Sequence, residues 1–100
     1  MGKFNERCYE ILKRIPLGKV VTYKDIADAL NSRAYRAVGN AMNKNKNLVV
    51  IPCHRVVCSD GSIGGYSKGF KRKIFLLRKE GVEIKNNKID LKKFRWKIKI

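Results

Sequence analysis

The chain has 100 residues, the length of one small domain, and 44% of them are hydrophobic, as in a globular protein. No apolar run approaches the ~20 residues that a membrane span needs, which excludes a membrane-spanning protein. The 24 Lys and Arg residues outnumber the 8 acidic residues and leave a formal charge of +16, which favours a polyanionic partner such as nucleic acid.

The three cysteines lie at positions 8, 53 and 58 and form no Cys-x-x-Cys pair. This pattern predicts neither a disulfide framework nor a zinc site, so we expect no metal. The first residues contain no signal-peptide hydrophobic region, and we therefore expect a cytoplasmic protein. We expect one domain over residues 1–100, with a core at 4–81 and a basic tail at 82–100.

The first half of the chain predicts three helices. Apolar residues on one face indicate a helix over residues 4–14. Thr22 is expected to cap the start of a second helix over 23–30, with Asp25 three residues later completing a capping-box-like arrangement. A third helix is expected from about 33 to 44, after a turn whose Asn or Ser can cap it. Two short helices joined by a short turn predict a helix-turn-helix.

The second half predicts strands, a loop region and one more helix. Apolar runs at 48–51 and 56–58 are typical of strands, and the turn at 59–62 indicates a wing or a pocket-forming loop. A helix is expected over 70–80, with Phe70 on its inner side and Gly81 as its stop. The tail predicts a small hairpin around Asn86-Asn87. The expected fold class is mainly α with a small β part, a winged helix-turn-helix.

The segment most suggestive of chemistry places Cys53 between Pro52 and His54, the only histidine. A thiol attacks as a thiolate, and a neighbouring imidazole and cation are expected to lower its pKa. A single Cys–His pair does not by itself establish an active site.

The residues around this pair extend the pattern. The run 51–57, Ile-Pro-Cys-His-Arg-Val-Val, resembles the active-site signature of the O6-alkylguanine-DNA alkyltransferases. Residues 18–23 and 36–39 resemble that family's helix-turn-helix, and Asn45 resembles the hinge asparagine that follows it. Residues 64–67 and 76–81 resemble its substrate-pocket loop and its last helix. The matches are collinear over about 4–81, and correspond to the family's C-terminal DNA-binding and active-site domain.

The resemblance implies a suicidal methyltransferase, in which Cys53 takes an alkyl group from O6 of guanine and keeps it as a thioether. No cofactor is implied. His54 and Glu80 match the residues that relay charge from the cysteine, following the logic of a catalytic triad. Tyr23 matches a tyrosine that contacts phosphate and donates a proton to the departing guanine. Asn45 is the hinge.

The implied partner is double-stranded DNA that contains O6-alkylguanine, bound by a nucleoid-associated monomer, with cooperativity left open. The target base must be rotated out of the stack. Arg36 resembles the arginine that fills the vacated space. The expected DNA-contacting residues are Tyr23, Ala34, Tyr35, Arg36 and Ala37. The expected walls of the base pocket are Val56, Tyr66 and Ser67.

Two other functions fit parts of the pattern. Alkyltransferase-like proteins share this short layout and bind alkylated DNA without transfer, but tryptophan typically replaces their cysteine, whereas Cys53 is present here. A winged-helix transcription factor explains the charge and the helix-turn-helix but not residues 52–55. Tyr35 stands where the family usually has a small residue, which leaves the depth of helix insertion open.

Overall fold

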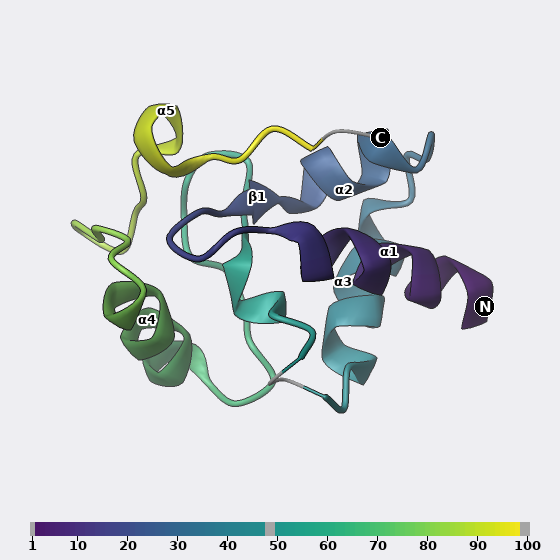
Figure 1. The fold of residues 1–100 in the computed structure, drawn as a ribbon, viewed down its shortest axis with the longest axis horizontal. Helices are drawn as coiled ribbons and strands as arrows, with labels where there is room; N and C mark the ends of the chain where they lie inside the picture. Colours follow the sequence, from purple (N-terminus) through teal and green to yellow (C-terminus); the bar gives the residue numbers. More distant parts are fainter. Residues whose placement is uncertain (1, 48–49, 99–100) are drawn as a thin grey trace.

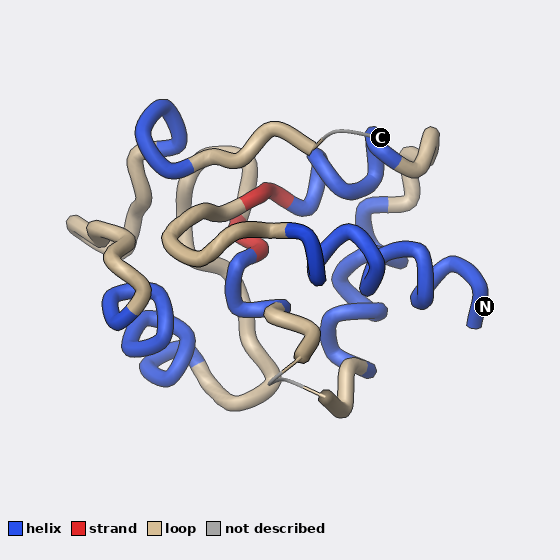
Figure 2. Tube along the Cα trace, in the orientation of Figure 1, coloured by secondary structure: helices blue, strands red, loops and turns tan. Residues whose placement is uncertain are grey.

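A computed structural model describes residues 2–47 and 50–98 of the chain. Most of it is helical, with one two-stranded sheet near the centre (Figures 1 and 2). The expected fold class, mainly α with a small β part and built on a helix-turn-helix, is confirmed. No described helix has the length and apolar character to cross a membrane. In order, the elements are α1 (Gly2–Arg14), β1 (Val21–Thr22), α2 (Tyr23–Ala29), α3 (Tyr35–Lys44), the 3-10 helix η1 (Cys53–Arg55), β2 (Val56–Val57), α4 (Phe70–Lys79) and α5 (Leu91–Phe94).

The helix-turn-helix consists of α2 and α3. The Thr22 hydroxyl accepts a hydrogen bond from the Asp25 N–H at 3.0 Å, and the Asp25 carboxylate accepts one from the Thr22 N–H at 3.0 Å. The predicted capping box is therefore confirmed. The second helix begins at Tyr35, two residues later than expected, because the chain is still non-helical at Ala34 (φ −81°, ψ 64°). The Ser32 hydroxyl accepts a hydrogen bond from the Ala34 N–H at 3.0 Å instead of capping a helix at 33.

The sheet joins the two halves of the chain. β1 and β2 are parallel, with Val21 opposite Val56 and Thr22 opposite Val57, and all four residues are buried. The strand expected at 48–51 is wrong where it is described, since Val50 lies in a turn and Ile51 in a bend; residues 48–49 lie outside the described residues.

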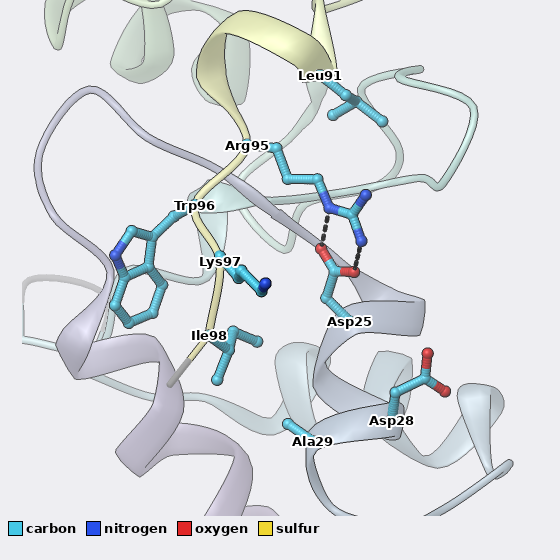
Figure 3. A pocket seen from close by; sticks show the side chains of 8 residues that line it. All are labelled: Asp25, Asp28, Ala29, Leu91, Arg95, Trp96, Lys97 and Ile98. Carbon is cyan, nitrogen blue, oxygen red and sulfur yellow. Dashed lines mark hydrogen bonds and ion pairs between the residues drawn. The ribbon is translucent and has the colours of Figure 1, made fainter. Parts of the chain in front are cut away.

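The segment after Gly81 is part of the packed structure. Ile84, Ile89 and Phe94 are buried, and the Trp96 N–H donates to the Val20 carbonyl at 2.7 Å. Arg95, directly after α5, forms an ion pair with Asp25 of α2. Both residues line a cavity of about 490 Å³ (Figure 3). The predicted hairpin around Asn86-Asn87 is confirmed, whereas α5 was not predicted.

Candidate active site

Cys53 is the first residue of η1, which leads directly into β2. Its side chain is 4% exposed, and its N–H donates to the Ile51 carbonyl at 2.9 Å. The segment is a tight turn and not an extended strand, because the Arg55 N–H donates back to the Pro52 carbonyl at 3.0 Å. Burial raises the pKa of the Cys53 thiol, although a hydrogen bond with Asn45 and the charge of Lys73 act to lower it. The expectation that neighbouring groups give this thiol a low pKa is therefore wrong.

His54, Arg55 and Glu80 form one buried network. His54 Nε2 lies 2.7 Å from Glu80 Oε2, and Arg55 donates from Nε to Oε1 at 2.8 Å and from Nη2 to Oε2 at 2.9 Å. Burial lowers the pKa of His54 even though Glu80 raises it, so the ring is neutral at pH 7. Burial alone would raise the pKa of Glu80, but the hydrogen bonds from Arg55 and His54 outweigh it and leave that pKa low.

The network fixes the tautomer of the His54 ring. A neutral imidazole beside an ionised carboxylate carries its proton on the nitrogen that faces the carboxylate, here Nε2. Nδ1 is then an acceptor. It is buried and has no hydrogen-bond partner among the described residues. A buried, unpaired acceptor next in sequence to the thiol can take a proton.

Asn45 ends α3 and anchors the segment that leads to Cys53. Its side chain is 6% exposed; its Nδ2 donates to the Ile51 carbonyl at 2.8 Å, and its Oδ1 accepts from the Asn47 N–H at 2.9 Å. Both ends of its amide are thus used within the turn before Cys53. Asn45 therefore links the end of α3 to the segment that precedes Cys53.

Lys73 is a site residue that the sequence reasoning missed. It is fully buried, and its ammonium group donates to the Val56 carbonyl at 2.6 Å and to the Gly65 carbonyl at 3.0 Å. Burial lowers its pKa to about 8. One signal was available, since Lys73 lies four residues before Leu77 on the same helical face. Phe70, which was expected on that face, is 43% exposed.

Tyr23 connects the active site to the helix-turn-helix. Its ring centroid lies 5.9 Å from the Lys73 ammonium nitrogen, and burial raises the pKa of its hydroxyl to about 12. Together with Tyr35 and Cys58 it lines a cavity of about 460 Å³. Ala34, Tyr35 and Arg36, at the start of α3, are exposed, and Ala37 is half-buried.

The residues expected to form a base pocket are not all together. The Tyr66 ring lies 6.4 Å from the His54 ring, nearly perpendicular to it at 79°, and both line a groove of about 670 Å³. Ser67 is exposed in the turn before α4. Val56 is fully buried in β2 and does not line that groove.

The comparisons with known proteins agree on one family. Residues 3–82 match the DNA-binding domain of 6-O-methylguanine DNA methyltransferase. A bifunctional methyltransferase/endonuclease from Picrophilus torridus is 48% identical over 89 residues, which are 88% of this chain and 30% of that protein. A methylated-DNA–protein-cysteine methyltransferase from Saccharolobus solfataricus is 52% identical over 81 residues, 81% of this chain. The chain spans 52% of that relative's length.

Solved structures give the same result. S. pombe Atl1, in a complex with damaged DNA that contains O6-carboxymethylguanine, is 35% identical, with a TM-score of 0.87 and coverage of 97% of both chains. The O6-methylguanine-DNA methyltransferase of Pyrococcus kodakaraensis is 52% identical, with a TM-score of 0.73 over 79% of this chain and 46% of that chain. Mycobacterium tuberculosis OGT in complex with DNA is 39% identical, with a TM-score of 0.75 over 78% of this chain and 48% of that chain.

Proposed function

The chain belongs to the 6-O-methylguanine DNA methyltransferase family, and we propose that it repairs DNA by moving an alkyl group from O6 of guanine onto its own Cys53. We infer further that it corresponds to the DNA-binding and active-site domain found at the C-terminal end of longer members. Its substrate would be double-stranded DNA with one O6-alkylguanine, and it would act once, as a monomer.

The observation that carries this proposal is the His54–Glu80 pair, 2.7 Å apart, directly after the buried Cys53 in the chain. In the proposed reaction the thiol gives its proton, through a water, to Nδ1 of His54, whose Nε2–H donates to Glu80 at 2.7 Å. The thiolate then attacks the alkyl carbon, so that a sulfur–carbon bond forms as the carbon–O6 bond breaks. Guanine leaves with the electron pair and is protonated, with the Tyr23 hydroxyl as donor. No step needs a metal or an organic cofactor.

We propose that DNA lies against the exposed start of α3. Tyr35, Ala34 and Ala37 would face the groove, and Arg36 would enter the base stack when the target base rotates out. Tyr66 and Ser67 would hold the rotated base, with Val56 supporting the pocket from the core. The formal charge of +16 supports binding to phosphates.

The test is intact-protein mass spectrometry after incubation with a duplex that carries one O6-methylguanine. We expect the mass of one methylene group to be gained and to map to Cys53. A Cys53→Ser variant should bind the duplex and gain nothing, while Cys58→Ser, the matched control thiol, should gain the same mass as the wild type. Clearance of O6-methylguanine by Cys53→Ser would contradict the proposal.

A second candidate is a lesion-binding protein without transfer. It is favoured by the match to Atl1, which extends over 97% of both chains. Cys53, His54 and Glu80 argue for transfer. Tight binding of the lesion with no mass gain would decide for the second candidate.

A further inference from the structure

The hairpin between α4 and α5 places two like charges directly opposite each other. The Lys85 N–H donates to the Lys88 carbonyl at 3.0 Å and the Lys88 N–H to the Lys85 carbonyl at 2.9 Å. Asn86 and Asn87 form the tip with positive φ of 52° and 60°. Directly paired residues of an antiparallel hairpin project from the same face, where like charges repel. This arrangement lowers the stability of the hairpin.

Acidic groups among the described residues offset the charge of the two lysines only in part. Both are exposed, and neither ammonium group forms a hydrogen bond or an ion pair there. Neighbouring cations differ, since Lys93 pairs with Glu83 at 3.0 Å. The charge of Lys88 helps to lower the pKa of Asp60, but the largest cause of that shift is the hydrogen bond that the Asp60 carboxylate accepts from the Ser62 N–H. Repulsion between two charges that form no ion pair within the described residues is typical of a functional surface, and two lysines would bind an anion.

The hairpin is held rigidly against the turn at residues 58–62. The Ile89 N–H donates to the Gly61 carbonyl at 2.8 Å, and Ser62 pairs with Lys88 as an antiparallel bridge. Gly61 has φ 89°, and a Cβ there would lie 2.6 Å from the Ile89 carbonyl oxygen, so the two segments approach as closely as glycine allows. The buried Ile89 anchors the hairpin to the core. Its lysines are therefore presented from a fixed scaffold.

The same turn borders the expected DNA surface on its other side. Cys58 and Ser59 line the cavity that contains Tyr23 and Tyr35. The Cys58 N–H donates to the Ser62 carbonyl at 2.9 Å, so the turn leads directly from that cavity to the hairpin. In Figure 1 the segment between α4 and α5 projects at the end of the molecule opposite the N-terminus.

We propose that the Lys85–Lys88 hairpin is a wing that contacts the phosphate backbone of the duplex beside the helix-turn-helix. Its partner rests on the proposed function, in which DNA is bound.

The experiment compares the wild type, Lys85→Gln/Lys88→Gln and a matched control, Lys3→Gln/Lys79→Gln, which removes the same charge from exposed positions on α1 and α4. Binding to a lesion duplex is measured from low to high salt. Loss of two phosphate contacts should reduce the slope of log K against log[salt] by about 1.8 in the hairpin variant. The control slope should stay at the wild-type value. Transfer to Cys53 at saturating duplex should be unchanged in both variants.

Thermal unfolding adds a second readout. Removal of the repulsion should leave the Tm of the hairpin variant equal to or above that of the wild type. Equal salt slopes in the hairpin and control variants, or a clear fall in the hairpin variant's Tm, would overturn the proposal. A reduced slope with no mass gain on Cys53 would support the wing while refuting the transfer reaction. A wild type that binds no duplex would refute both.

Discussion

Replacing Lys73 by Met tests whether a buried positive charge stabilises the thiolate form of Cys53. The substitution keeps an unbranched side chain that is one atom shorter and removes the charge. At pH 7 two effects on the free energy of unfolding oppose each other. Burial lowers the pKa of Lys73 from 10.5 to about 8, so the charged form is disfavoured in the folded protein. Removing this charge should therefore stabilise the protein by about 3 kcal/mol. The carbonyls of Val56 and Gly65 lose their donor at about 1–3 kcal/mol each, so the net change should be small.

The pH dependence isolates the buried charge. Below pH 8 Lys73 is protonated in both the folded and the unfolded chain, and its contribution is constant. Between pH 8 and 10.5 the unfolded chain binds more protons, so the stability of the wild type rises with pH, by about 2.5 kcal/mol at pH 10. Lys73→Met lacks this gain. Cys8 and Tyr23, whose pKa values burial raises to about 11 and about 12, act in the opposite direction but are present in both proteins.

The assay is urea unfolding of both proteins from pH 7 to pH 10, with the difference in unfolding free energy plotted against pH. A difference that stays constant would refute the assignment of Lys73 as a buried cation. In single-turnover transfer at pH 7.5 we expect Lys73→Met to be about tenfold slower. A tenfold change corresponds to about 1.4 kcal/mol of lost thiolate stabilisation, because the charge of Lys73 acts to lower the pKa of Cys53. Lys79→Met, at an exposed position of the same helix, should transfer at the wild-type rate.

Two further substitutions test other parts of the site. Glu80→Gln should lower the free energy of unfolding by about 3–5 kcal/mol in urea, because the buried Arg55 loses its charged partner and one of its two acceptor oxygens. It should also slow transfer because the His54 ring loses its carboxylate; a stable, fully active variant would contradict the network. Arg36→Ala should slow single-turnover transfer from duplex DNA while the free base O6-benzylguanine reacts nearly normally, and equal losses on both substrates would argue against insertion into the stack.

The parts of the fold that the sequence predicted well are set by local interactions. Helix α1 follows from apolar residues on one face, and the start of α2 follows from Thr22 and Asp25, three residues apart. Gly81, with φ 94°, ends the last long helix as expected. Each of these signals lies within one or two turns of the chain.

The errors arose where distant segments determine the structure. Cys53 follows an apolar run that reads as a strand, yet the bond from Asn45 to the Ile51 carbonyl and the proline at 52 bend the chain into a 3-10 turn. Lys73 reads as one more surface lysine among many. Only the approach of two carbonyls, at Val56 and Gly65, makes its burial possible.

Burial acts on the two central groups in directions that suit a protein that reacts once. It raises the pKa of Cys53, so the free protein holds a protonated and poorly nucleophilic thiol. It lowers the pKa of His54, so a neutral base with an unpaired Nδ1 stands ready. In a protein that cannot regenerate its cysteine, an adventitious reaction in solution is a permanent loss of one molecule. In the proposed reaction, a thiol that stays protonated until a base occupies the pocket would limit that loss, and Glu80 and Lys73 would then stabilise the charges that transfer creates.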